Sequence, residues 1–338
     1  MTTTTRRVRP APTPARGRLT RTFGLLGRRA LQIPGVLLMV SAALFWLIHV
    51  VPGDPGRNAL GPYATESQVA AWNSAHGAEA GPLEGYVSWL AGFATGDWGV
   101  SLVYDVPVLG LVMGRFVNSV ALGVLAFALL VPLAIGIGAL QARTEGSRGD
   151  RATTVTLMTL ASVPEFVIGV VFLIVFAVVL PIAPVRATDG LGSGVVLHVG
   201  AMLLPALTLA LGTVSIVART ARSSIIDTTR APFYRAAVVR GLSGGELFRR
   251  HVARNALGPT IAVLGLCLGV FIGGSAVVET LFGYPGLGEL LVTATQRKDL
   301  PVLTAGVMVT GFVSLAALLA TDLALAAVDP RVRLSEGS

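Results

Sequence analysis

The chain has 338 residues, of which 53% are hydrophobic and only 13% are charged. A soluble domain usually has about a quarter of its residues charged, so this composition excludes an ordinary water-soluble domain and favours a membrane bundle. The net charge of +8 does not indicate a nucleic-acid-binding protein, because the basic residues lie in hydrophilic connections and not along one face. Cys267 is the single cysteine and lies in an apolar stretch, which excludes an intrachain disulfide and is typical of a packing residue.

Six apolar stretches are long enough to cross a membrane as helices, for which about 20 residues are needed. In chain order they are 33–51, 118–140, 154–182, 195–218, 258–282 and 302–328. We therefore expect an all-α integral membrane protein with six transmembrane helices, in which 118–328 forms a five-helix core. The third stretch contains Pro164, which predicts a kink. The first stretch is longer than a signal-peptide core and no small-residue cleavage site follows it, so we expect an uncleaved anchor.

The Arg and Lys residues of the connections predict the orientation of the chain. Of the 26 basic residues, 21 fall on the side that contains both termini and only 5 fall on the other side. The positive-inside rule places the more basic side in the cytoplasm. We therefore expect a multi-pass protein with both termini in the cytoplasm.

The connections differ in length and character. Residues 1–32 are rich in Thr, Pro and Arg, and we expect a disordered basic tail and pre-span segment there. Residues 52–117 form a large external loop, whose tryptophans are typical of anchors at the membrane interface. Within this loop the segment 101–114 is too short and too polar to cross, and it predicts an interfacial or re-entrant piece. Residues 329–338 form a cytoplasmic tail.

The cytoplasmic connection 219–257 is much longer than two neighbouring helices require, and it carries helix signals. Pro232 suits the first turn of a helix, and Gly241 suits a left-handed cap after its end. Ser243, with Glu246 three residues later, is a capping-box pattern that predicts a second helix. Together these residues predict a helix, a sharp corner and a second helix.

The first of these two helices has the features of a docking element. Ala236 and Ala237 would let another backbone approach closely, and Phe233 beside them would fill a pocket on a partner. The alternative is a connection that is basic only because it holds the orientation of the chain. The combination of caps and small residues favours docking.

Several short motifs together resemble a known family. Residues 235–241, RAAVVRG, resemble the EAA coupling motif of ABC-importer permeases, and residues 251–259, HVARNALGP, resemble the stretch that follows it. Further motifs similar to that family are 52–55 (PGDP), 96–101 (GDWGVS), 279–288 (ETLFGYPGLG) and 329–333 (DPRVR). On these residues the chain resembles the dipeptide, oligopeptide and nickel permeases, in the branch with a long first external loop.

The resemblance implies a type I ABC-importer permease in the lipid of the bacterial cytoplasmic membrane. Its implied partners are a second homologous permease, two ATPase subunits and an external substrate-binding protein, with no nucleic acid. Peptides are the leading substrates, with nickel complexes, glutathione and haem as alternatives. The residues that we expect to couple the chain to the ATPase are Phe233, Arg235, Ala236, Ala237, Arg240, Gly241, Ser243 and Glu246.

Acidic residues inside apolar stretches are costly unless they are paired or hydrated, so they indicate a functional path. Glu165 lies near the middle of the third stretch. There it would face a hydrated pathway or a second subunit, or else make a polar contact within the bundle. The translocation path or gate that we expect comprises Glu165, Glu279, Phe282, Pro285 and Gly286.

The sequence contains no standard phosphate-binding loop, because its only lysine, Lys298, is followed by Asp299 and not by Ser or Thr. The four histidines are scattered and lack the spacing of metal ligands. We therefore expect no catalytic residue, metal site or cofactor in this chain, with ATP and magnesium bound by the partner ATPase subunits. Two other classes remain open: a proton-coupled secondary transporter with Glu165 and Asp322 as its relay, and a membrane enzyme.

Overall fold

The computed structural model describes residues 32–46, 55–61, 63–75, 82–187, 199–248, 252–273 and 275–328. In these residues the regular structure is helical, apart from one isolated bridge between Val100 and Pro107. The expected all-helical class is confirmed. The tails predicted at 1–32 and 329–338 lie outside the described residues, except for Gln32, as do the end of the first predicted span and the start of the fourth.

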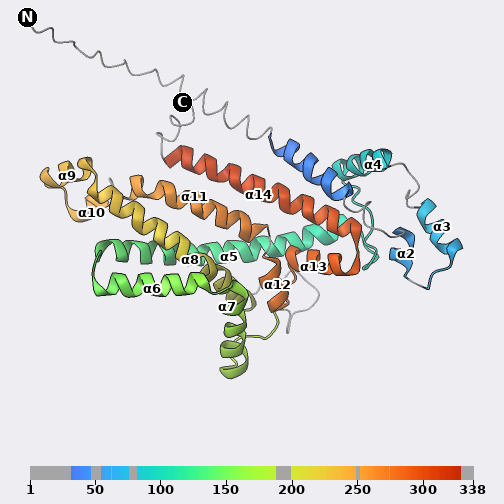
Figure 1. Ribbon diagram of the computed structural model, residues 1–338, viewed down its shortest axis with the longest axis horizontal. Helices are drawn as coiled ribbons and strands as arrows, with labels where there is room; N and C mark the ends of the chain where they lie inside the picture. The colour runs from blue at the N-terminus through green and yellow to red at the C-terminus, as the bar shows by residue number, and fades with distance from the viewer. Residues whose placement is uncertain are drawn as a thin grey trace, which may run out of the picture.

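Four long helices form the body of the molecule and run along its long axis (Figure 1). They are α5 (Val108–Arg143), α8 (Val199–Arg230), α11 (Ala253–Ile272) and α14 (Leu300–Val328). Within the described residues these four are long and apolar enough to cross a membrane, and a bent pair makes a fifth if it counts as one span. The helix Gln32–Trp46, at the place of the first predicted span, is shorter. The predicted number of six spans is larger than the four or five that the described residues show.

Small residues let α5 approach its neighbours closely. A Cβ added at Gly138 would lie 2.6 Å from the carbonyl oxygen of Ala218 and 2.8 Å from the Cβ of Ala221, both on α8. A Cβ added at Gly123 would lie 2.9 Å from the carbonyl oxygen of Phe271 on α11. Glycine at these two positions therefore sets the distance between α5 and the two helices that it packs against.

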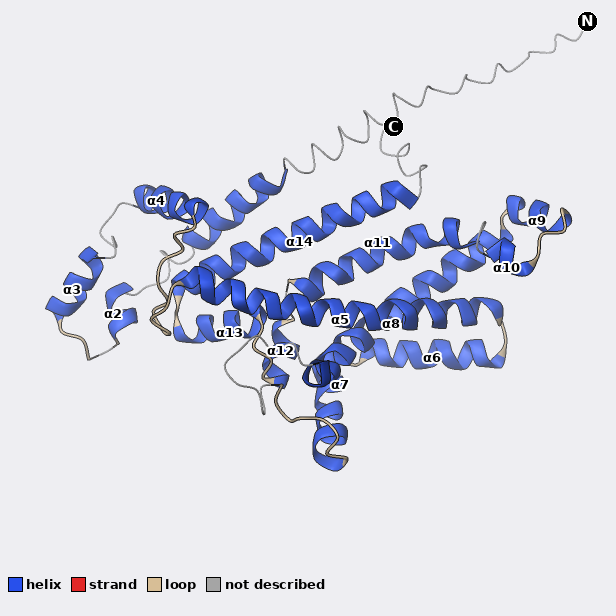
Figure 2. Cartoon of the chain, turned by 180° about the vertical axis from the view of Figure 1, so that it is seen from behind, coloured by secondary structure: helices blue, strands red, loops and turns tan. Residues whose placement is uncertain are grey.

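The third predicted span is divided into two helices that meet at 97°. The first is α6 (Arg148–Ser162), and the second is α7 (Glu165–Phe172), which continues into the π-helix η1 (Leu173–Val179). Proline disfavours the helical conformation of the residue before it, and Val163 is accordingly extended, with a ψ of 123°. The kink predicted at Pro164 is therefore confirmed. Figures 1 and 2 show α7 projecting away from the long helices.

The prediction of one continuous helix over 258–282 is wrong. The helix α11 covers only the first part of this stretch, and α12 (Ala276–Phe282) follows after a break. The sequence Gly-Gly-Ser at 273–275 explains the break, because a glycine inside a helix costs about 1 kcal/mol relative to alanine. Gly283, with a φ of 57°, then ends α12 and leads to α13 (Leu287–Arg297).

Two predicted boundaries are also corrected. The interfacial piece predicted at 101–114 is wrong in its second half, because α5 already begins at Val108. A closed loop precedes it, in which the Val108 N–H donates to the carbonyl oxygen of Gly99 at 3.0 Å. The fourth span was predicted to end at 218, but α8 continues to Arg230. Hydropathy marks only the part of a helix that suits hydrocarbon, so polar turns at either end escape it.

Three short helices lie at one end of the molecule (Figure 1). They are α2 (Pro55–Leu60), α3 (Glu66–Ala75) and α4 (Pro82–Thr95). The Gly56 N–H donates to Asn73 Oδ1 at 2.8 Å and ties α2 to α3. The external loop predicted at 52–117 therefore contains helical structure in its described part.

A row of aromatic rings attaches α4 to the helix Gln32–Trp46. Phe45 meets Tyr86 edge-on at 5.4 Å between ring centroids, and Tyr86 stacks on Trp89 at 6.2 Å. Trp89 contacts Phe93 at 5.6 Å, and Phe93 stacks on Trp98 at 4.7 Å. Such pairs stabilise beyond the area that they bury. Two of the tryptophans expected at the membrane interface thus also pack on protein neighbours.

Candidate coupling site and buried polar contacts

The corner that follows α8 lies at the end of the molecule opposite α2, α3 and α4 (Figure 1). It begins with α9 (Pro232–Val239), where Pro232 occupies the first turn and needs no hydrogen bond from its nitrogen. Gly241 follows the C-cap residue Arg240 with a φ of 79°, and its N–H donates to the carbonyl oxygen of Val238 at 2.9 Å. Glycine adopts this conformation without a steric penalty. The left-handed cap predicted at Gly241 is confirmed.

The second helix of the corner is the short α10 (Gly244–Leu247). Ser243 is its N-cap residue, and the Ser243 hydroxyl oxygen accepts a hydrogen bond from the Glu246 N–H at 3.4 Å. Leu247 of this helix is buried. The predicted order of helix, corner and second helix is therefore confirmed, although it begins at 231 and not at 219.

The two faces of α9 differ. Ala237 is buried and Tyr234 is half-buried, so this face packs on the chain itself. Phe233 and Ala236 are exposed, and Val239 is 87% exposed. Both alanines were predicted to let a partner approach closely, but only Ala236 is exposed on the surface. Apolar side chains are therefore left uncovered on this face of α9.

A cavity of about 240 Å³ lies behind α9. Arg143 of α5 and Thr229 of α8 line it, together with Tyr234 of α9 and Phe248 after α10. The Arg143 guanidinium lies 5.7 Å from the centroid of the Phe248 ring, a cation–π contact. The corner therefore rests on the ends of both α5 and α8.

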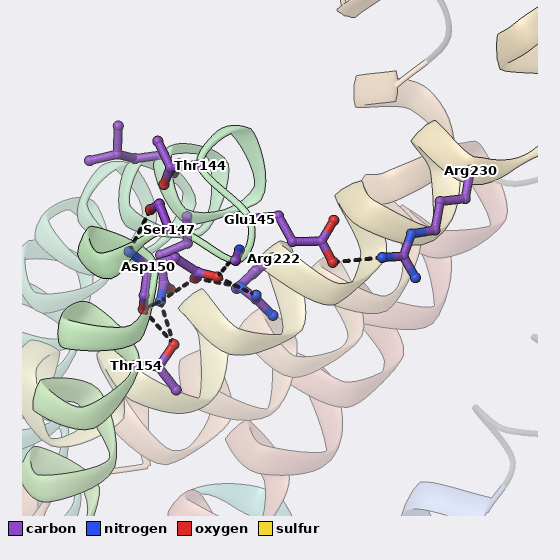
Figure 3. A network of polar contacts seen from close by, with 10 residues as sticks. Thr144, Glu145, Ser147, Asp150, Thr154, Arg222 and Arg230 are labelled. Carbon is purple, nitrogen blue, oxygen red and sulfur yellow. Dashed lines mark hydrogen bonds and ion pairs between the residues drawn. The ribbon is translucent and has the colours of Figure 1, made fainter.

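An ion pair joins the first turn of α6 to α8 (Figure 3). Arg222 Nε donates to Asp150 Oδ1 at 3.0 Å, and Arg222 Nη2 donates to Asp150 Oδ2 at 2.7 Å. The Gly146 N–H donates to Asp150 Oδ2 at 3.0 Å, and Asp150 is only 4% exposed. Ser147 caps α6 by accepting the Asp150 N–H at 3.1 Å. A bidentate pair of this kind fixes both side chains in one relative orientation.

A second ion pair lies beside the first. Arg230 Nη2 donates to Glu145 Oε1 at 2.7 Å, but these side chains are 66% and 41% exposed. Water therefore screens this pair much more strongly than the pair of Asp150 and Arg222. Neither pair was predicted from the sequence. For Asp150 the available signal was an acid in the first turn of a helix, on the more basic side of the chain.

Glu279, one of the predicted path residues, lies in a buried corner. Glu279 is 1% exposed. Its carboxylate accepts hydrogen bonds from the Ser119 hydroxyl at 2.6 Å and from the Glu289 N–H at 3.0 Å. Ser119 Oγ in turn accepts the Leu287 N–H at 2.7 Å. The first N–H groups of a helix have no acceptor within the helix, and Ser119 and Glu279 supply acceptors for those of α13. Gly286 is required here, because a Cβ would lie 2.3 Å from the Glu279 carboxyl carbon.

The other predicted path residues of this motif are packed in the same corner. Phe282 is buried, and the Pro285 carbonyl oxygen accepts a hydrogen bond from Asn118 Nδ2 at 2.8 Å. The Tyr284 hydroxyl donates to the Asn118 carbonyl oxygen at 2.7 Å. The structure therefore brings Glu279, Phe282, Pro285 and Gly286 together. Their role in a path or gate stays a prediction.

Glu165 lies apart from that corner, at the first turn of α7. Ser275, in the break between α11 and α12, donates to Glu165 Oε1 at 3.3 Å. A Cβ added at Gly212, in the middle of α8, would lie 3.2 Å from the Glu165 Cβ. The two broken helices therefore meet at this partly exposed carboxylate, midway along α8.

Residues 134–334 match the family described as binding-protein-dependent transport system inner membrane component. The chain belongs to this family. The probable peptide ABC transporter permease protein y4tP of Sinorhizobium fredii is 33% identical, over 90% of this chain and 98% of its own length. The oligopeptide transport system permease protein AppB of Bacillus subtilis is 30% identical, over 90% and 98%. The glutathione transport system permease protein GsiC of Salmonella choleraesuis is 31% identical, over 90% and 97%.

The resemblance to peptide permeases is therefore confirmed, and the permease is a multi-pass membrane protein. The matched residues include α9, the pair of Asp150 and Arg222, and the corner around Glu279. The helices α2, α3 and α4 and most of α5 precede them.

One further buried carboxylate of the permease was missed. Asp299 accepts hydrogen bonds from the Ser101 hydroxyl and from the Leu102 N–H, the latter at 3.3 Å. It also accepts the Val302 N–H at 3.4 Å and so caps α14. The sequence Asp-Leu-Pro at 299–301 was the available signal, because Asp is a preferred N-cap residue and Pro suits the first turn.

Proposed function

We propose that this chain is the membrane subunit of an ATP-driven importer, which forms a path for peptides delivered by an external binding protein. The surface that carries the proposal is the outer face of α9. It presents Phe233, Ala236 and Val239 at the tip of the molecule, and its orientation is fixed by the cap at Gly241. Large exposed apolar side chains beside small ones suit the pocket of a partner protein.

The partner on this face would be an ATPase subunit. The chain has one lysine, Lys298, in a context that does not form a phosphate-binding loop. ATP and magnesium would therefore bind to two separate ATPase subunits, one on this chain and one on a second, homologous permease. ATP binding would move α9, and the spans would shift between inward and outward access.

The substrate class follows from the names of the relatives. Those names include peptide, oligopeptide and glutathione transport, and glutathione is itself a tripeptide. Peptides are therefore the class that all three share. Glu165 would lie on the path, because it is a partly exposed carboxylate midway along the bundle. The buried corner from Glu279 to Gly286 would act as a gate only if it moves as a unit.

The orientation that we propose places α9 and both termini in the cytoplasm, and α2, α3 and α4 outside. The turn between α5 and α6 and the corner after α8 lie at the same end of the molecule (Figure 1). The sequence segments 141–153 and 219–257, which include these two connections, contain 11 of the 16 basic residues outside the tails. That distribution supports the cytoplasmic assignment of this end.

The experiment co-expresses the chain with its second permease and ATPase subunits and measures two quantities. They are the ATPase recovered with the purified permease, and the uptake of radiolabelled dialanine or a tetrapeptide with the binding protein present. We expect Phe233→Asp to reduce ATPase recovery by about tenfold and to abolish uptake. Tyr63→Asp, at an exposed position between α2 and α3, is the matched control and should leave both unchanged.

Two results would contradict the proposal. The first is normal ATPase recovery with Phe233→Asp and also with Val239→Asp, which would remove α9 as the docking element. The second is an assembled, ATP-hydrolysing complex that takes up neither peptide, which would remove peptides as the substrate class.

A further inference from the structure

Few buried groups hold α6 to the rest of the permease. Asp150 and Leu157 are the buried residues of α6, whereas most of its other side chains are exposed. Leu157 packs in the hydrophobic core, and its carbonyl oxygen accepts a hydrogen bond from Ser215 Oγ of α8 at 2.8 Å. Asp150 makes the second attachment to α8, through Arg222. The position of α6 therefore depends strongly on Asp150.

The geometry around Asp150 makes this attachment stiff. The two hydrogen bonds from Arg222, at 3.0 and 2.7 Å, prevent the side chains from rotating independently. The Gly146 N–H and Gln141 Nε2 donate to the same carboxylate, at 3.0 and 3.4 Å. Asp150 is thus held to the turn between α5 and α6 as well as to α8. Because Asp150 is buried, salt and water screen this pair less than a surface pair.

Arg222 and the docking helix lie on one continuous stretch of helix. The helix α8 runs unbroken to Arg230, and α9 begins at Pro232. Arg222 lies about 12 Å from the end of α8, at 1.5 Å per residue. From the other partner, Asp150, the helix α6 runs to the 97° bend that precedes Glu165. A displacement of α9 therefore has a continuous route to this bend.

We propose that Asp150 and Arg222 are positioning residues that transmit the movement of α9 to α6 and so to the bend at Pro164. The inference rests on the proposed function, in which α9 docks on an ATPase subunit. Without the pair, α8 and α9 would still move when ATP binds, but α6 would not follow. ATP hydrolysis would then continue without uptake.

The chain supplies a matched control in the pair of Glu145 and Arg230. This pair joins the turn between α5 and α6, and not α6 itself, to the same helix α8, and it is largely exposed. Exposed ion pairs contribute little to stability or stiffness. Glu145→Gln removes a charge as Asp150→Asn does, and it should change neither uptake nor hydrolysis.

The first experiment measures uptake and ATP hydrolysis by the complete complex in liposomes, with the external binding protein and radiolabelled dialanine. Uptake by the unmodified complex is established first, so the proposed function is tested before any variant is compared. Asp150→Asn and Arg222→Gln should lower the uptake per ATP hydrolysed by about tenfold, while hydrolysis stays near the unmodified rate. Arg222→Lys keeps the charge but loses the bidentate contact, so it should restore part of the uptake.

Two outcomes of this experiment would overturn the inference. If uptake and hydrolysis fall in proportion, the pair serves only to stabilise the fold. If both stay at the unmodified level, the pair has no part in transmission.

A second measurement detects the movement itself. Spin labels are placed at the exposed positions Thr156 of α6 and Asp227 of α8, in a chain with Cys267→Ala. In the unmodified complex the distance between the labels should stay constant when ATP binds, because the two helices move together. In Asp150→Asn that distance should change with ATP. A distance that behaves the same in both assembled complexes would refute the inference.

Discussion

At the scale of single residues, the buried carboxylates of this permease act as fixed acceptors for backbone N–H groups. Glu279 accepts from the first turn of α13, Asp299 from the first turn of α14, and Asp150 from the turn before α6. An unpaired N–H in an apolar environment costs several kcal/mol, so each carboxylate stabilises a turn that would otherwise be unfavourable. A buried carboxylate therefore fixes each of these three turns.

A substitution of Gly241 tests the corner at α9. Its φ of 79° imposes a penalty of roughly 1–2 kcal/mol on a residue with a side chain, although a Cβ there would meet open space. Gly241→Val should therefore leave the chain inserted and folded but change the angle of α9, so that peptide uptake and ATPase recovery both fall. Gly244→Ala is the control, because its φ is not positive and a Cβ there also meets open space. Normal uptake by Gly241→Val at normal expression would mean that the corner has no part in coupling.

The success of prediction at this scale depended on distance along the chain. The caps at Pro232, Gly241 and Ser243 were predictable because each depends on residues within one turn. The partners of Asp150 and Asp299 were not, because they lie 72 and 198 residues away. A single sequence carries no signal that pairs residues across such separations, so these contacts had to come from the fold.

At the scale of helices, the bend at Pro164 and the break at 273–275 differ in how clearly the sequence indicates them. The bend at Pro164 was predictable because proline acts on the residue directly before it. The break at 273–275 was missed because glycine and serine hardly lower the hydropathy of an apolar window, although two glycines weaken a helix. The two breaks meet where Ser275 donates to Glu165, and nothing local in either segment indicates that contact.

The close contact between α5 and α8 yields a prediction with a matched control. At Gly138 a Cβ would lie 2.6 Å from the Ala218 carbonyl oxygen, so Gly138→Ala must push the two helices apart. We expect it to destabilise the permease by about 1–3 kcal/mol, the usual cost of overpacking. At Gly136, two residues earlier on the same helix, a Cβ meets nothing within 4 Å. Gly136→Ala should therefore be neutral or slightly stabilising.

Thermal unfolding in detergent, followed by the loss of folded monomer in size-exclusion chromatography, measures this difference. A lower midpoint for Gly138→Ala than for Gly136→Ala is the expected order. Equal midpoints would show that α5 and α8 can move apart without a loss of stability. The two helices could not then act as a stiff unit.

At the scale of the whole molecule, the two ends differ in what they present. One end carries α9, α10 and the turn between α5 and α6, whereas the other carries α2, α3 and α4 (Figures 1 and 2). The long helices between them connect the docking face proposed on α9 to α2, α3 and α4 at the other end. The succession of apolar helices was predictable from composition, whereas the break at 273–275 was not, because a break divides an apolar stretch without changing its length. The count of six spans stays a prediction.

The orientation of these two ends is the last prediction. Positions Val239 of α9 and Ser67 of α3 are both exposed and lie at opposite ends of the molecule. Single cysteines are introduced at each, in a chain with Cys267→Ala that is expressed without ATPase subunits, so that α9 stays uncovered. Because the segments 141–153 and 219–257 contain 11 of the 16 basic residues outside the tails, the positive-inside rule places the α9 end in the cytoplasm. A membrane-impermeant maleimide should therefore label Ser67→Cys in spheroplasts and Val239→Cys only after the membrane is permeabilised. Labelling of Val239→Cys in sealed spheroplasts, with Ser67→Cys protected, would invert the orientation and with it the side on which the ATPase docks.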